Sequence, residues 1–154
     1  MIQIIEQRLK NVHCEIVRPY VTALQGLALH SRYTPKVIPD LDTRVLYEID
    51  LLCEANITVA NETICRLAAT HYAKIQVGMD VADNAERLDK VLMVILPNTL
   101  ANDARATISR LSVMAGYPQV VIPMQNFAGL LAKMRANRPV VPSPLKDIGV
   151  THAH

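Results

Sequence analysis

The side chains best suited to chemistry in this 154-residue chain are three carboxylates about one third of the way along it. Glu48, Asp50 and Glu54 are separated by even numbers of residues, so they share one face if the segment is a strand. Two carboxylates on one face can act as general acid and general base. The same pattern is typical of a solvated strand face, and no nucleophile with an adjacent base accompanies it. We therefore expect a binding protein and not an enzyme.

The histidines do not indicate a metal site. His13, His30 and His71 are scattered along the chain, and His13 and His71 lie in segments with strand periodicity. The C-terminal THAH offers only the pair His152 and His154, which is fewer than the ligands of a closed zinc site. The sequence also contains no glycine-rich phosphate-binding motif. We expect no metal and no cofactor.

Three widely spaced cysteines, Cys14, Cys53 and Cys65, form no CxxC pair. We expect them to be free thiols that pack as small apolar groups, which is typical of a reducing compartment. The N-terminal segment carries Glu6 and has no long apolar block, so neither a signal peptide nor a membrane span is expected. These features favour the cytoplasm.

Composition limits the class of protein. Apolar residues make up 51% of the chain and charged residues 19%, which excludes intrinsic disorder. The net charge of +2, the absence of Trp and a single Phe argue against nucleic-acid binding. The length suits one domain. We expect that domain at 1–137 and a flexible, proline-rich tail at 138–154.

Strand periodicity dominates the first half of the chain. Residues 44–58 and 63–78 alternate apolar and polar side chains, and a turn at 60–62 joins them as a long hairpin. Residues 12–17 alternate in the same way. Residues 35–43 read as an edge strand or a bent one, because a proline interrupts them. The sequence thus predicts four antiparallel strands.

Helical periodicity follows. Residues 83–96 predict a helix capped by Asp83 and stopped by Pro97, and residues 99–115 predict a second helix that ends at Gly116. A third helix follows the later loop. Strands followed by helices indicate an α+β fold in which the helices lie on one face of an antiparallel sheet.

A proline-fenced apolar loop precedes the last helix. Pro118 and Pro123 flank the apolar residues of the loop, and Asn126 is the expected helix cap. The loop and the helix stripe contain Val120, Val121, Ile122, Phe127, Leu130, Leu131 and Met134. Together with the sheet they carry more apolar surface than a small monomer easily hides. Such surface marks a ligand groove, or a homo-oligomer interface beside an ordinary core.

The order of these motifs resembles the SecB family of protein-export chaperones. The C-terminal third, ATISRLSVMAGYPQVVIPMQNFAGLLAKM, has the family's helix ending in glycine, its Pro-Gln loop with a second proline, and its Asn-Phe helix start. The segments PKVIPDLDT, YEI and TICRL resemble its second, third and fourth strands. The resemblance covers roughly residues 7–136. The second proline is displaced by one position relative to the usual family loop.

The resemblance implies a four-stranded antiparallel sheet with helices on one side and a homotetramer built as a dimer of dimers. It implies an ATP-independent holdase, or chaperone, that binds unfolded polypeptides in long apolar grooves for protein export and translocation. The floor of the groove would contain Cys65, Leu67 and Ala69. Its wall would contain Val120, Val121, Ile122, Phe127, Leu130, Leu131 and Met134.

The chain departs from the family in the charges of the residues that would dock a partner protein. Members are typically acidic and dock onto the SecA motor through acidic strand residues, whereas this chain has a pI of about 8.5. Glu15 keeps one such acid, and Asn11 and Arg66 replace two others. Ile64, two residues before Arg66, is the fourth residue of the expected docking face. We expect weak or altered SecA docking, because rim charges govern partner choice.

Three alternatives remain open at this point. A dedicated chaperone for one partner, such as the antitoxin of a toxin–antitoxin pair, would suit the lost acids. A small-molecule binder or enzyme on the same sheet predicts a closed pocket with convergent polar groups. A structural oligomer without a client predicts that the apolar surface disappears inside subunit contacts.

Overall fold

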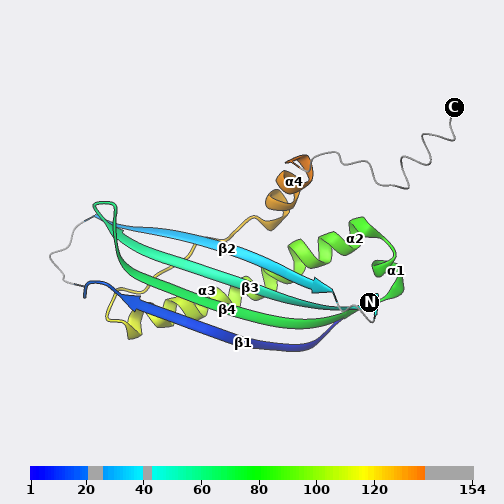
Figure 1. Ribbon diagram of the computed structural model, residues 1–154, viewed down its shortest axis with the longest axis horizontal. Coiled ribbons are helices and arrows are strands. Elements are labelled where there is room, and N and C mark those ends of the chain that lie inside the picture. The colour runs from blue at the N-terminus through cyan, green and yellow to red at the C-terminus, as the bar shows by residue number, and fades with distance from the viewer. Residues whose placement is uncertain (21–25, 40–42, 138–154) are drawn as a thin grey trace.

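The computed structural model describes residues 1–20, 26–39 and 43–137. The expected tail, its THAH pair and part of the predicted strand at 35–43 lie outside these residues. The described chain forms one sheet of β1 (Ile2–Ile16), β2 (Leu27–Pro39), β3 (Leu46–Val59) and β4 (Glu62–Val77). All pairs are antiparallel and the spatial order is β1-β4-β3-β2 (Figure 1). The predicted α+β class is confirmed, and β1 and β2 are the two edge strands.

The two edge strands extend further towards the N-terminus than the sequence predicted. β1 begins at Ile2, well before the predicted segment 12–17. The sequence pattern did not reveal this earlier part because the pairing register shifts after Ile4 and again after Leu9. Each shift leaves one residue out of the pairing and breaks the period of two. β2 occupies 27–39 and ends at its second proline, where the missing N–H stops a ladder.

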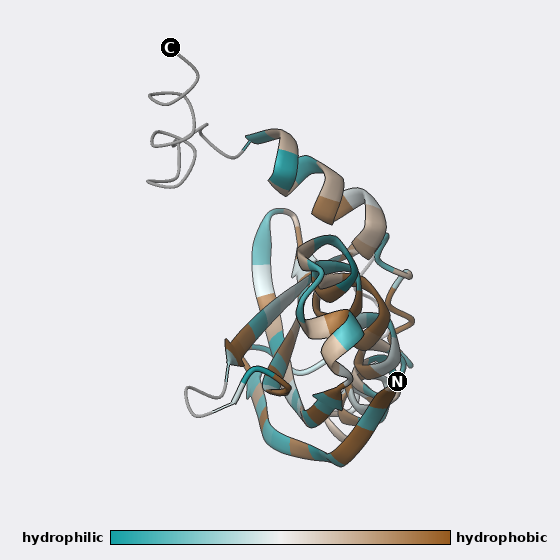
Figure 2. Cartoon of the chain, turned by 90° about the vertical axis from the view of Figure 1, so that its right-hand side faces the viewer, coloured by the Kyte–Doolittle hydropathy of each residue, from teal (hydrophilic) through white to brown (hydrophobic). Residues whose placement is uncertain are grey.

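The β3–β4 hairpin is confirmed, and its turn is tighter than 60–62. Ala60 and Asn61 have φ values of 50° and 64°, as the two central residues of a type I′ turn require. Beyond the turn, alternate residues of both strands are buried against the helices. The resulting alternation of apolar and polar residues is visible along the strands in Figure 2.

The helical half begins earlier than predicted and has a different cap. α1 (Met79–Ala82) follows β4 directly, and α2 (Ala85–Lys90) begins after Asn84. The Asn84 side chain accepts a hydrogen bond from the N–H of Arg87 at 3.1 Å, so the prediction of Asp83 as the cap was wrong. Asparagine is as good a cap as aspartate, and sequence alone did not separate the two neighbours.

Pro97 does not stop the helix, contrary to prediction. A π-helical turn, η1 (Val91–Ile95), leads directly into α3 (Leu96–Met114), and Pro97 sits in the first turn of α3. The wide π turn shifts the hydrogen-bond ladder at this point, so the missing proline N–H costs little. α3 ends at Met114 and is followed by the predicted stop residue Gly116, whose φ is 84°, the left-handed conformation that glycine adopts readily.

α4 (Phe127–Asn137) begins at the predicted cap. Asn126 accepts a hydrogen bond from the N–H of Gly129 at 2.9 Å. A Cβ at position 129 would lie 2.9 Å from the Asn126 side-chain nitrogen, so the cap geometry favours glycine there. In Figure 1, α4 stands beyond the β2 edge of the sheet.

The core lies between α3 and the two central strands. α3 contacts β3 and β4, and its fully buried side chains include Leu100, Ala104 and Ile108. The helix does not cover β1. Ile2, Ile4, Leu9, Val12 and Ile16 occupy the helix-side face of β1 and stay 41–48% exposed. No helix in the described ranges is long and apolar enough to cross a membrane.

Candidate functional site

The proline-fenced loop lies along α3 and is fixed to it by side chains of that helix. The N–H of Val120 donates to Ser112 Oγ at 2.9 Å, and Ser109 Oγ donates to the carbonyl of Val120. Two residues further on, Arg105 Nε donates to the carbonyl of Ile122 at 2.8 Å. These bonds to the backbone hold the loop as a defined wall beside the helix.

Tyr117 fixes the start of the same loop. Its hydroxyl lies 3.2 Å from the carbonyl oxygen of Ile64 and also contacts the carbonyl of Arg18. Its ring packs at a tilt against Tyr20, with centroids 5.9 Å apart. Burial raises the pKa of Tyr117, so its hydroxyl stays a hydrogen-bond donor at neutral pH. The loop is therefore tied to the end of β1 and the start of β4.

A hollow of about 190 Å³ opens between this loop and the end of the β2–β3 pair. Its lining is uncharged and mostly apolar: Leu27, Ala28, Leu29, Ile57, Tyr117, Pro118, Gln119, Val120 and Val121. Because no charged side chain among the described residues lines it, the hollow suits a neutral, apolar group. It is open and shallow, so it differs from the closed pocket with convergent polar groups that a small-molecule site usually has.

Phe127 closes the far end of the loop against the sheet. Its ring meets Tyr33 of β2 edge-on, with centroids 5.8 Å apart. Tyr33 lies opposite Cys53 in the strand register, and burial raises the pKa of both groups, that of the Cys53 thiol to about 11. A thiol with so high a pKa is protonated and a poor nucleophile at neutral pH. These side chains act as core packing.

The predicted groove residues fall into two groups. Cys65, Leu67 and Ala69 form the sheet surface beneath α3 and are at most 1% exposed, so they offer no open floor in this chain. Ile122 and Phe127 are also buried. The predicted residues that reach solvent are Val121, 69% exposed, and Met134, 46% exposed, while Val120, Leu130 and Leu131 are half-buried.

The floor of the hollow comes instead from β2 and β3. Leu27, Leu29 and Ile57 supply it. The sequence analysis placed no strand between residues 18 and 34, so it missed Leu27 and Leu29, and it placed Ile57 on a strand without assigning it to the groove. A signal was present, since Leu27, Leu29 and Tyr33 have the spacing of one strand face.

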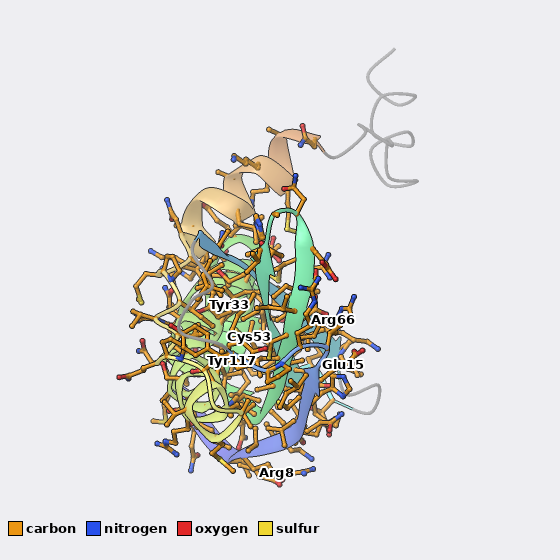
Figure 3. All side chains as sticks on the ribbon, turned by 90° about the vertical axis from the view of Figure 1, so that its left-hand side faces the viewer. Arg8, Glu15, Tyr33, Cys53, Arg66 and Tyr117 are labelled. Atoms are coloured by element: carbon orange, nitrogen blue, oxygen red, sulfur yellow. The ribbon has the colours of Figure 1, made fainter. Side chains whose placement is uncertain are left out.

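The opposite sheet face carries the predicted docking residues. Glu15 is paired with Arg66 in the register, and the two side chains form an ion pair at 3.2 Å. Figure 3 shows Glu15 and Arg66 on the side away from Tyr33, Cys53 and Tyr117. Asn11 is exposed on β1 opposite Thr70, whereas Ile64 is only 1% exposed. The charge of Glu15, the one retained acid, is thus neutralised by Arg66, which stands where a second acid was expected.

Two of the three carboxylates considered for acid–base chemistry are paired with cations on other strands. Lys10 reaches Asp50 at 2.9 Å, and Arg32 reaches Glu54 at 2.7 Å. These cross-strand ion pairs tie the outer face together. In the part of the chain that the structure describes, no group of three or more His, Cys, Asp or Glu residues is arranged to hold a metal ion.

The buried side chain of His71 begins a polar chain that runs from β4 to the exposed side of α3. Its Nε2 lies 3.0 Å from Thr107 Oγ1, and Thr107 Oγ1 donates to the carbonyl of Asp103 at 3.0 Å. The threonine has one hydroxyl hydrogen, so His71 Nε2 is the donor in the first contact. Burial lowers the pKa of His71, which favours the neutral ring. His71 therefore serves the helix–sheet interface.

Comparison with known proteins supports the fold. No protein-family model and no curated protein sequence matches the chain. A SecB-like chaperone of Mycobacterium tuberculosis, solved in complex with a ChAD peptide from the HigA1 antitoxin, matches with a TM-score of 0.68 and 18% identity. The match covers 80% of this chain and 90% of that chain. A protein of unknown function from Streptococcus agalactiae matches with a TM-score of 0.47 and 6% identity, over 80% of this chain and 98% of that chain. The chain therefore has the SecB-like fold, a four-stranded antiparallel sheet with helices packed on one face.

Proposed function

We propose that this protein is an ATP-independent chaperone that holds unfolded or non-native polypeptides through apolar contacts. The observation that carries the proposal is the uncharged hollow between the loop 117–121 and the β2–β3 end, open to solvent and bordered by the exposed side chain of Val121. Burial of client side chains there would contribute about 25 cal/mol per Å². Binding alone opposes aggregation, so the proposal includes no nucleotide, metal, cofactor or enzymatic step.

The binding surface that we propose is narrower than the sequence suggested. Leu27, Leu29 and Ile57 form its floor and Val121 its rim. A second hollow lies between α4 and the α2–η1 segment, but it is a mixed surface, because Leu131 and three other apolar residues share its lining with charged Glu86, Lys90 and Arg135. Leu130 and Met134 lie on the same helix. The SecB-like neighbour, which was solved with a bound antitoxin peptide, supports a polypeptide as the ligand.

Light scattering tests this function directly. Guanidinium-unfolded citrate synthase is diluted into buffer with and without the protein, and no ATP is added. We expect the wild type to suppress scattering and Val121→Asp to suppress it less, because apolar client side chains that bind at the rim would strip water from the charged carboxylate. Ile38→Asp is the matched control, since Ile38 is 44% exposed on β2 and lies outside the hollow. Equal scattering with and without wild-type protein would contradict the proposal.

We also propose that β1 associates with a second copy of the chain. Its helix-side face carries half-exposed apolar residues, and its outer edge has no strand partner in the described residues. Unpaired edges and exposed apolar patches of this kind are typical of interfaces. A homotetramer built as a dimer of dimers is the assembly that we expect. Light scattering combined with size exclusion measures it, and a monomer at micromolar concentration would contradict this expectation.

A dedicated chaperone for a single partner is the second candidate. The ion pair between Glu15 and Arg66 favours it, because the outer face offers little net negative charge to a basic motor such as SecA. We expect weak binding of SecA by the wild type and tighter binding by Arg66→Glu, measured by interferometry. Tight, salt-sensitive binding of SecA by the wild type would favour the export chaperone. In either case we expect a cytoplasmic protein, because a chaperone for newly synthesised polypeptides would bind them in the cytoplasm.

A further inference from the structure

The side chains of Cys14 and Cys65 lie on the same face of two neighbouring strands. In the β1–β4 register, Cys14 is opposite Leu67 and Ile16 is opposite Cys65. Residues directly opposite each other in an antiparallel pair point to the same face of the sheet, and Leu67 and Cys65 both lie on the face that packs against α3. Cys14 is therefore the diagonal neighbour of Cys65 on this face.

The two thiols are close enough to interact. Burial, and then the Cys14 thiol beside it, raises the pKa of Cys65 to about 11. Diagonal neighbours have Cα atoms about 7–8 Å apart and Cβ atoms somewhat closer, whereas a disulfide usually joins Cα atoms up to about 6.8 Å apart. A movement of about 1 Å would close this difference. An edge strand such as β1 can make it, because it has one neighbouring strand in the sheet and not two.

Backbone hydrogen bonds hold the two strands together at this end of the sheet. The N–H groups of Val17 and Arg18, just beyond β1, both donate to the carbonyl of Ile64, at 2.9 and 3.1 Å. The hydroxyl of Tyr117 lies 3.2 Å from the same oxygen. Ile64 directly precedes Cys65, so the backbone that carries the buried thiol is fixed.

The two thiols differ in their access to solvent. Cys14 is exposed, because α3 does not cover β1, whereas Cys65 is 0% exposed. A dissolved oxidant therefore reaches Cys14, and Cys65 is the second thiol beside it, which is the usual arrangement of a redox-sensitive pair. Cys53 is too distant to replace Cys65. It lies opposite Ala69, four residues along β4 from Cys65, or about 13 Å.

We propose that Cys14 and Cys65 form a reversible disulfide after a hydroperoxide oxidises the exposed Cys14 thiol. The pair lies outside the lining of the apolar hollow, so the proposal does not rest on polypeptide binding. In a reducing compartment such a bridge is transient, as disulfides of cytosolic proteins usually are.

The reaction has two steps. The Cys14 thiolate attacks one oxygen of the hydroperoxide and breaks the O–O bond, which gives a sulfenic acid and, from hydrogen peroxide, one water. The Cys65 thiolate then attacks the Cys14 sulfur, and the sulfenic oxygen leaves as hydroxide and takes up the Cys65 proton. Two thiols and one peroxide give one disulfide and two waters. A dithiol reductant reverses the reaction by thiol–disulfide exchange.

The bridge would fasten the end of the edge strand to β4. It would close beside the hydrogen bonds from Val17 and Arg18 to Ile64, and strand ends are where such bonds open most easily. We expect the amides of Val17 and Arg18 to exchange more slowly in the oxidised protein, and dithiothreitol to restore the original rates. Unchanged exchange in protein that contains the bridge would contradict this effect.

Peptide mapping tests the bridge itself. Full-length wild-type protein is treated with hydrogen peroxide, its remaining thiols are blocked with N-ethylmaleimide, and it is digested with trypsin without reduction. The protein is dilute, because an interface at β1 would slow the access of peroxide to Cys14. We expect peptide 11–32, which contains Cys14, to be joined to peptide 45–66, which contains Cys65. Dithiothreitol should separate the two peptides.

Two variants assign the second thiol, because peptide 45–66 contains Cys53 as well as Cys65. Cys53→Ala is the matched control: it removes another buried thiol and should leave the bridge unchanged. Cys65→Ala should abolish the bridge and leave the Cys14 sulfenic acid without a partner. Dimedone, which traps sulfenic acids, should then label Cys14 several times more strongly than in the wild type.

Three results would overturn the proposal. One is a bridge that persists in Cys65→Ala and disappears in Cys53→Ala. Another is a wild-type product that consists mainly of two chains joined through Cys14, seen as a dimer on a non-reducing gel. The third is the absence of any bridge in wild-type protein whose Cys14 has been oxidised by the peroxide.

Discussion

The ring of Phe127 meets the ring of Tyr33 edge-on, with the centroids 5.8 Å apart, and this contact joins the start of α4 to the edge strand β2. Phe127 is 1% exposed, whereas much of the rest of α4 faces solvent. The chain places its only phenylalanine at this junction. This buried ring therefore anchors the start of α4 to the sheet, in addition to the hydrogen bonds from α3 that hold the preceding loop.

Replacing this ring should destabilise the protein markedly. We expect Phe127→Ala to lower the free energy of unfolding by about 3 kcal/mol, through lost burial and the cavity it leaves. Urea denaturation measures the change. Met114→Ala is the control, since Met114 is 82% exposed and its loss should change stability by less than about 0.5 kcal/mol. Similar midpoints for the two variants would show that the Phe127 contact contributes little.

The β3–β4 turn offers a stabilising substitution. Ala60 has a φ of 50°, a left-handed conformation that is unfavourable for a residue with a Cβ. We expect Ala60→Gly to raise the free energy of unfolding by about 0.5–1 kcal/mol, after allowing for the greater freedom of glycine in the unfolded chain. Asn61→Gly should gain less, because asparagine tolerates this conformation. A loss of stability in Ala60→Gly would contradict the turn geometry.

His71 makes stability depend on pH in a predictable direction. Burial lowers its pKa in the folded state below the ordinary value of about 6.5, so the unfolded chain binds a proton more readily. Its contribution to stability is therefore present above about pH 6.5 and lost as the pH falls towards the lower folded pKa. We expect the unfolding free energy of the wild type to fall between pH 7.5 and pH 5.5 more steeply than that of His71→Gln. Parallel pH profiles would argue against this role.

Cys14 reports on the proposed association of β1. It is the one exposed thiol among the three cysteines, and it lies on β1, whereas Cys53 and Cys65 are buried. We expect Cys53 and Cys65 to react with Ellman's reagent only as the protein unfolds. If a second copy covers β1, Cys14 should react slowly at high protein concentration and faster on dilution. A Cys14 rate that is fast and independent of concentration would contradict an interface at this strand.

Local sequence patterns were sufficient for the centre of the fold. The alternation through β3 and β4 predicted the hairpin, because both strands pack one face on helices and expose the other. Asn126 and Gly116 were readable as helix boundaries, since capping and left-handed backbone depend on the residue itself. The motif order also pointed to the SecB-like fold that the structural comparison supports.

At positions where two local rules favour different structures, the sequence alone did not predict the structure that forms. The bulges after Ile4 and Leu9 hid most of β1, because each one reverses the phase of the alternation. The sequence predicted Pro97 as a helix stop. In the structure the preceding π turn shifts the hydrogen-bond ladder, so the missing proline N–H does not end the helix. Asp83 and Asn84 were equally good caps by type, and only the path of the backbone chose between them.

The candidate site was likewise only partly predictable from the sequence. The sequence identified Val120, Val121 and Ile122 together, because an apolar run between two prolines is a local feature, but it did not show that Val121 is exposed and Ile122 buried. The burial of Cys65, Leu67 and Ala69 could not, since it depends on which strands α3 covers. The hollow itself joins Leu27 and Ile57 to a loop that is distant in sequence. Sequence determined which residues are apolar and extended, and tertiary packing decided which of them remain open, because burial is set by contacts between distant segments.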